Sequence, residues 1–209
     1  MALSALTLVG TDLALVGAWR LEFRAHASVA IVHDSIFSVE ADALVSPANS
    51  FGVMDGGLDG KLRDYFGPSI EQRVRERIAA QFHGELPVGL ACIVETSHER
   101  HPYLICAPTM RCPADVSGTV NAYLAMKAIL NEAIGHARPL RIAVPGLCSL
   151  TGGMGAPQVA RQMRIAYERV VAGLYRYSHW REEREFERFI RGESSSPPVD
   201  LESRPRASR

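Results

Sequence analysis

Lysine is nearly absent from this chain of 209 residues: Lys61 and Lys127 are the only two among 23 basic side chains, which 23 acidic side chains balance. The zero formal charge and the pI of about 7.1 provide no overall field that would attract a polyanion. We therefore expect no nucleic-acid binding through bulk charge.

Long apolar runs are also missing. No segment approaches the roughly 18 consecutive apolar residues that a membrane-spanning helix needs. Residues 1–10 lack the basic start and the cleavage site of a signal peptide. We therefore expect a cytoplasmic protein that does not associate with a membrane.

Metal-binding patterns are scarce as well. The chain has four cysteines at no CxxC spacing: Cys92, Cys106, Cys112 and Cys148. Three of them lie in apolar or strand-like segments, which favours structural thiols over the alternatives of zinc ligands or disulfides. His98 and His101 have no cysteine or second carboxylate near them. We expect no metal site and no resident cofactor.

What is present is the composition of one globular domain, with a hydrophobic fraction of 47%. Residues 1–175 are predicted to form this α/β domain. Residues 176–191 carry mixed charges at helical spacing, which predicts a solvent-exposed terminal helix. Residues 192–209 are rich in serine, proline and charge and have little to bury, so this tail is predicted to be disordered.

Short apolar runs alternate with longer segments of helical period, which predicts an α/β layer fold. An antiparallel meander is expected at one edge, with strands at 6–9, 12–18, 20–23 and 28–33. Buried strands are expected at 43–46, 89–95, 103–107 and 141–144. Helices are expected at 57–66, 68–82, 117–135 and from 157 onward.

Two glycine-rich loops follow predicted buried strands and run directly into predicted helices. Residues 46–60 read SPANSFGVMDGGLDG, and residues 145–157 read PGLCSLTGGMGAP. Such loops expose backbone N–H groups at the positive end of a helix, so each is a candidate phosphate cradle, and the pair suits a diphosphate. Neither loop matches the P-loop or GxGxxG patterns. Tight turns in a packed sheet are the alternative explanation.

Four segments, in this order, resemble the macro domain family: 42–49 (DALVSPAN), 56–59 (GGLD), 104–108 (LICAP) and 150–155 (LTGGMG). The resemblance covers residues 28–174, nearly all of the predicted fold. It implies a three-layer α/β/α sandwich around a mixed central sheet. It also implies that ADP-ribose binds in a crevice at the strand ends, and many members of this family hydrolyse ADP-ribose linkages.

The resemblance assigns roles to side chains in two loops. Asp34 would accept a hydrogen bond from the adenine amino group, with a turn or cap role as the alternative, and Ile36 belongs to the same ligand-binding set. Asn49 would contact the distal ribose, with a plain Asx-turn as the alternative. Phe51 would stack on that ribose or plug the loop.

The glycines would let the ligand approach the backbone, because side chains there would obstruct two phosphates. In the first loop, the backbone near one phosphate would be that of Gly56, Gly57 and Leu58. In the second loop, the backbone near the other phosphate would be that of Thr151, Gly152, Gly153, Met154 and Gly155.

Asp59 is the residue that the resemblance places at the chemistry, with Asn49 beside it. A carboxylate there can take a proton from water and stabilise positive charge on the sugar. The alternative is an aspartate that merely favours the start of a helix. Lys61, in the same predicted turn, is expected to be solvated.

Several positions depart from the family pattern. Ser46 and Pro47 stand where an asparagine and a small residue are common, and His33 stands where a glycine usually precedes the acid. Asp55 occupies a place often held by another glycine, and Met154 replaces an aromatic or branched residue over the distal phosphate. The two carboxylates of the first loop could tune substrate choice or raise one pKa.

The functional hypothesis is therefore binding of ADP-ribose with hydrolysis of a linkage at the distal ribose, either de-ADP-ribosylation or O-acetyl-ADP-ribose deacetylation. The expected partner is ADP-ribose or an ADP-ribosylated substrate. A non-catalytic reader of ADP-ribosylated protein or nucleic acid is the alternative. An accessory module whose pocket has drifted is a third, weaker one.

Overall fold

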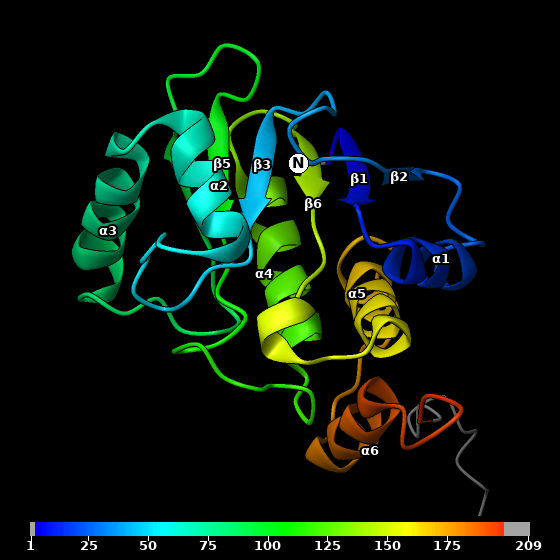
Figure 1. Ribbon diagram of the computed structural model, residues 1–209. Coiled ribbons are helices and arrows are strands. Elements are labelled where there is room, and N and C mark those ends of the chain that lie inside the picture. The colour runs from blue at the N-terminus through cyan, green and yellow to red at the C-terminus, as the bar shows by residue number, and fades with distance from the viewer. Residues whose placement is uncertain (1–2, 199–209) are drawn as a thin grey trace, which may run out of the picture.

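A six-stranded sheet forms the centre of the computed structural model, which describes residues 3–198 (Figure 1). Its strands are β1 (Ala5–Gly10), β2 (Val29–His33), β3 (Ala43–Ser46), β4 (Cys92–Glu95), β5 (Tyr103–Cys106) and β6 (Arg141–Val144). The helices are α1 (Leu13–Glu22), α2 (Gly57–Phe66), α3 (Ser69–Phe82), α4 (Asn121–Gly135), α5 (Ala156–Val170) and α6 (Trp180–Arg191). No helix within residues 3–198 is long and apolar enough to cross a membrane.

The strands follow the order β2-β1-β6-β3-β5-β4. Every neighbouring pair is parallel except β4 and β5, which are antiparallel. The sheet is therefore mixed, and the arrowheads of β1, β3 and β6 point to the same edge (Figure 1). Loops that leave the carboxyl ends of these strands meet at that edge, which is where open α/β sheets bind ligands.

The predicted meander at the N-terminal edge is wrong. Strands β1 and β2 pair in parallel, from Leu6 with Val29 to Gly10 with His33. Two parallel neighbours need a crossover between them, and α1 supplies it from the residues predicted as strands at 12–18 and 20–23. Asp12 starts this helix, because its side chain accepts a hydrogen bond from the N–H of Ala14.

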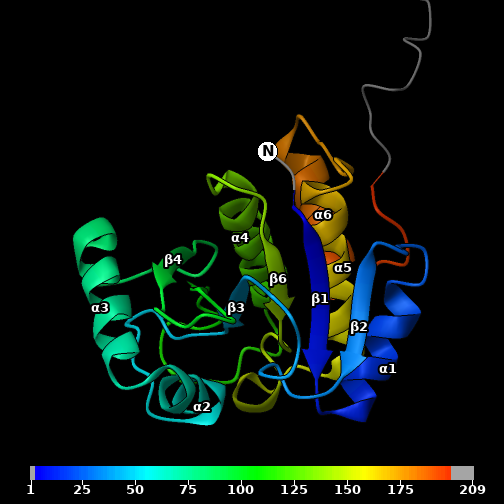
Figure 2. The same ribbon diagram turned by 90° about the horizontal axis from the view of Figure 1, so that it is seen from above.

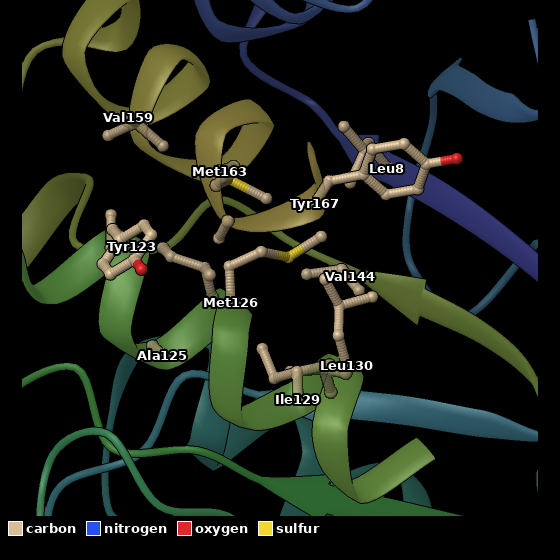
Figure 3. Packing of buried hydrophobic residues seen from close by; sticks show 14 of the residues in the cluster. Leu8, Tyr123, Ala125, Met126, Ile129, Leu130, Val144, Val159, Met163 and Tyr167 are labelled. Atoms are coloured by element: carbon tan, nitrogen blue, oxygen red, sulfur yellow. The ribbon is translucent and has the colours of Figure 1, made fainter. Parts of the chain in front are cut away.

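The sheet is covered on both faces, as the predicted three-layer sandwich requires. Helices α2 and α3 pack on one face, where Leu44 and Leu104 of the sheet share a buried cluster with Leu62 of α2 and Val74 of α3. Helices α1, α4 and α5 cover the other face (Figure 2). Figure 3 shows the contact between α4 and α5, in which the Met126 and Met163 side chains lie among buried apolar groups. The predicted three-layer α/β/α arrangement around a mixed sheet is confirmed.

The terminal helix differs from its prediction as a solvent-exposed element. One face of α6 is buried in the main core through Phe186, Phe189 and Ile190. Arg161 of α5 holds its end by donating to the carbonyl oxygens of Phe189 and Ser194. Residues 192–198 of the predicted tail thus carry defined contacts, and 199–209 lie outside the described residues.

Helices α3 and α4 begin later than the sequence predicts. Helix α4 begins at Asn121 rather than at 117, and its N-cap is Val120, whose side chain makes no capping hydrogen bond. Ser117 instead lies in a turn, where its N–H donates to Asp115 Oδ1 at 2.8 Å. Pro68 precedes α3 as its N-cap, so the predicted start is displaced by one residue.

Candidate active site

The two glycine-rich loops leave neighbouring strands in the middle of the sheet. The first connects β3 to α2, and the second connects β6 to α5. Strands β3 and β6 pair in parallel, with Ala43 opposite Ile142 and Leu44 opposite Ala143. Because both loops start at the carboxyl edge of adjacent strands, the fold brings together segments that are about a hundred residues apart in the sequence.

Asp59 lies in the first turn of α2 and is half-buried. Its Oδ1 accepts a hydrogen bond from Ser46 Oγ at 2.5 Å. Burial raises the pKa of Asp59 to about 6, the Ser46 hydrogen bond opposes this rise, and the negative charge of Asp55 adds to it. The carboxylate is therefore able to exchange a proton near neutral pH, as a general base must.

The start of α2 is open. Gly56 is the N-cap, and no side chain within residues 3–198 caps this helix end. The N–H groups of Gly57, Leu58 and Asp59 have no carbonyl partner inside the helix, as in the first turn of any α-helix. A Cβ added at Gly56 or Gly57 would meet no atom within 4 Å. This end can therefore receive an anion through its backbone.

The second loop is closed on itself. It contains a short 3-10 helix, Leu150–Gly152, followed by Gly153 at φ +67°. Three N–H groups of the predicted phosphate-binding set donate within the loop, namely those of Gly152, Gly153 and Met154, to the carbonyls of Ser149, Leu150 and Cys148. In the described chain, the N–H groups of Thr151 and Gly155 remain without such a bond.

Gly152 and Met154, both in the predicted phosphate-binding set, also contribute to the packing of the loop. Gly152 is buried, and a Cβ there would stand 3.0 Å from Val116 Cγ2. Met154 is 4% exposed and packs in the main core. Both residues therefore shape the loop from within.

Asn49 holds the first loop together. Its Nδ2 donates to the Val53 carbonyl at 2.7 Å, and its Oδ1 accepts from the N–H groups of Phe51 and Val53 at 3.1 and 3.3 Å. This is the Asx-turn geometry considered as the alternative role. A contact between this amide and a ribose would require these hydrogen bonds to be exchanged or shared.

Phe51 is half-buried and forms a platform with a residue that the sequence did not suggest. The Arg111 guanidinium lies over its ring at 5.0 Å from the centroid. Glu85 holds Arg111 in place through two hydrogen bonds of 2.8 and 3.0 Å. No motif links these three residues, because they come from three separate loops.

Asp34 follows β2 and is exposed at the same edge of the sheet. Its Oδ1 accepts from the N–H of Ser35 at 2.6 Å, so part of its acceptor capacity is used in its own turn. Ile36, by contrast, is 5% exposed and packs in the core beneath α2 and α3. Of the two, Asp34 alone offers a polar side chain to a ligand.

Lys61 and the cysteines are the remaining groups for which the sequence raised a chemical role. Lys61 is exposed on α2, and no group of three or more His, Cys, Asp or Glu residues within 3–198 could hold a metal ion. The four cysteines are free, and Cys112 is exposed. Burial raises the pKa of Cys148 to about 12, so this thiol stays protonated.

Comparison with known proteins identifies the family of this chain. The family model of the Macro domain matches residues 45–163, more than half of the chain. The chain therefore belongs to the macro domain family. An uncharacterised protein of Aquifex aeolicus is 32% identical to it over 135 residues, which cover 65% of this chain and 78% of that protein.

Solved macro domains share the fold. The macrodomain of Mycobacterium tuberculosis DarG is 21% identical with a TM-score of 0.52, over 65% of this chain and 87% of that one. A variant Oceanobacillus iheyensis macrodomain with ADPR (ADP-ribose) is 15% identical with a TM-score of 0.54, over 79% of this chain and 80% of that one.

Proposed function

We propose that this chain binds ADP-ribose at the carboxyl edge of its sheet and hydrolyses a linkage at the distal ribose. The observation that carries the proposal is the Asp59 carboxylate, half-buried in the first turn of α2, held by Ser46 Oγ and with a pKa of about 6. It lies next to the uncapped backbone of Gly56 and Gly57. An acid and an anion cradle thus share one helix end.

The diphosphate would be held with little help from side-chain charge. The N-termini of α2 and α5 both follow loops from the carboxyl edge, and neither has a side-chain cap. Their N–H groups and helix dipoles favour negative charge. With one phosphate at each helix end, the distal ribose would lie at the first loop, within reach of Asp59.

The chemistry asked of Asp59 is proton abstraction. A water molecule would attack the anomeric carbon or, in O-acetyl-ADP-ribose, the ester carbonyl. Asp59 would take its proton as the bond to the leaving group breaks. A carboxylate with a pKa near 6 is mostly ionised at pH 7 and is a stronger base than an ordinary aspartate.

Calorimetry and a substrate panel test this proposal together. Wild type should bind ADP-ribose and release it from at least one ADP-ribosylated or O-acetylated substrate. Asp59→Ala should lose at least about 100-fold in turnover while it retains binding. Asp64→Ala is the matched control, because Asp64 lies on the same helix with a side chain 78% exposed. Absence of ADP-ribose binding at high micromolar concentration contradicts the proposal.

A reader without turnover is the second candidate, and one observation favours it. The Asn49 amide uses its oxygen and one of its two N–H donors within its own loop, which leaves one N–H to orient a ribose. A reader would bind ADP-ribose with equal affinity in wild type and Asp59→Ala, and neither protein would release product from any substrate of the panel.

A further inference from the structure

Ser46 is the last residue of β3, a strand between β6 and β5 in the middle of the sheet. Its side chain is among the few polar ones that are fully buried, at 1% exposure. Its backbone is fixed by the register opposite Cys106 and by the hydrogen bond from the N–H of Ala107 to its carbonyl at 3.1 Å. The hydroxyl therefore has a rigid base.

That hydroxyl is directed at one oxygen of the acid on the neighbouring element. Ser46 Oγ donates to Asp59 Oδ1 at 2.5 Å, across 13 positions of sequence. No buried side-chain oxygen within residues 3–198 lacks a hydrogen-bond partner, and Oδ2 of Asp59 has none, so Oδ2 must reach solvent. One oxygen is thus tethered to the sheet, and the other faces outward.

We propose that Ser46 is a positioning residue that fixes the Asp59 carboxylate, so that Oδ2 alone is presented to the attacking water. This inference rests on the proposed function and names the group that prepares its base. Because the Ser46 side chain is covered, it would act through Asp59 and not on the ligand directly. A charge-assisted hydrogen bond from a rigid donor restrains the rotamer of the acid and stabilises its ionised form.

The two roles predict a kinetic pattern that a merely structural serine would not produce. In Ser46→Ala the carboxylate loses its tether, so kcat should fall about tenfold while KM and the affinity for ADP-ribose stay within about twofold. The ionised form also loses a donor, so the rise of kcat/KM with pH should move to higher pH. Ser46→Thr keeps the hydroxyl and should restore both properties.

The experiment measures pH profiles of turnover for wild type, Ser46→Ala and Ser46→Thr on the substrate that wild type releases fastest. Ser28→Ala serves as the control. Ser28 directly precedes β2, its hydroxyl is hydrogen-bonded to that of Tyr167, and its removal leaves Asp59 unchanged. Carbon-13 titration of the Asp59 carboxyl in the same variants reports the tether without any substrate, and Ser46→Ala should titrate at higher pH.

The failures can be told apart. A wild type that turns over no substrate overturns the proposed function, whatever the titrations show. Turnover with the same kcat and pH profile in wild type and Ser46→Ala overturns the role of Ser46 alone. A Ser46→Thr variant as impaired as Ser46→Ala does the same, since the hydroxyl would then not be the group that matters.

Discussion

The two loops are both rich in glycine but have different structures. The first, ahead of α2, has open space beside Gly56 and Gly57 and a carboxyl tethered from the sheet, and its helix end has no side-chain cap, as is also true of α5. The second, ahead of α5, turns three of its N–H groups onto its own carbonyls and buries Met154. Its tip is Leu150, which is 90% exposed.

The difference separates two uses of glycine. In the first loop, glycine keeps space free on the outside, where a ligand would approach the backbone. In the second loop, Gly152 keeps space free on the inside, against Val116, and Gly153 supplies a left-handed turn. The first loop therefore presents a phosphate site on its outer side. The second loop can offer a phosphate the N–H groups of Thr151 and Gly155, and its other N–H groups would become available only if the hydrogen bonds inside the loop broke.

The largest stability effect is expected from removing the charge that distinguishes the first loop. The pKa of Asp59 is raised from 3.8 to about 6 by burial, so between these values the folded protein binds a proton that the unfolded chain does not. The free energy of unfolding should therefore fall as pH rises from about 4 and level off above about 6.

Asp59→Asn should abolish this fall. The free energy of unfolding of the variant minus that of wild type should therefore be about 1–3 kcal/mol larger at pH 8 than at pH 4. Urea unfolding of both proteins across this range measures it, with Asp64→Asn as the exposed control. Equal pH dependence in wild type and Asp59→Asn would show that burial costs this carboxyl nothing.

A smaller effect should come from forcing the second loop out of its turn. Gly153→Ala places a Cβ at φ +67°, about 3.3 Å from the Asp115 carboxyl. The left-handed backbone and the close contact together should cost about 1–2 kcal/mol of folding stability. Thermal unfolding compares this variant with Gly155→Ala, where an added Cβ meets nothing within 4 Å. Equal melting temperatures would mean that the second loop is not closed.

The converse change in the first loop should affect binding and spare stability. Gly56 is extended, at φ −159°, and has open space around its Cα, so Gly56→Ala should melt like wild type. Its methyl group would stand where a phosphate is proposed to approach, so affinity for ADP-ribose should fall about tenfold, or about 1.4 kcal/mol. Calorimetry that finds unchanged affinity would remove the first loop from the phosphate site.

The smallest effect is expected at the tip of the second loop. Leu150 is 90% exposed, so Leu150→Ser should change folding stability by less than about 0.5 kcal/mol. Calorimetry with ADP-ribose then shows whether the tip takes part in binding. A large loss of stability would mean that this side chain is covered in solution.

Much of the fold could be predicted from the sequence because its signals are local. The strand at 43–46 and the helix at 57–66 have the bounds of β3 and α2, since both are framed by proline or glycine. Helix α1 was missed because its apolar residues show little helical periodicity. Asp12 before this run was the available N-cap signal.

Only part of the candidate site could be predicted from the sequence. A glycine before a helix is visible in the sequence, so the first loop could be identified from it, and the resemblance to the macro domain family pointed to Asp59. The Ser46 tether could not, because a hydrogen bond between a strand end and a helix start depends on how the two elements pack. The same applies to Arg111 over Phe51 and to the closed state of the second loop, whose carbonyl partners no motif encodes.

Helix α6 determines the shortest fragment of this chain that should fold with its core covered. The family match ends at residue 163, yet Phe186, Phe189 and Ile190 beyond it are at most 4% exposed. A polypeptide that ends at residue 175 would lack Phe186 and Phe189, and the surface of α5 that they cover would be exposed to solvent. Such a surface promotes aggregation, so recombinant work on the site should retain residues through 198.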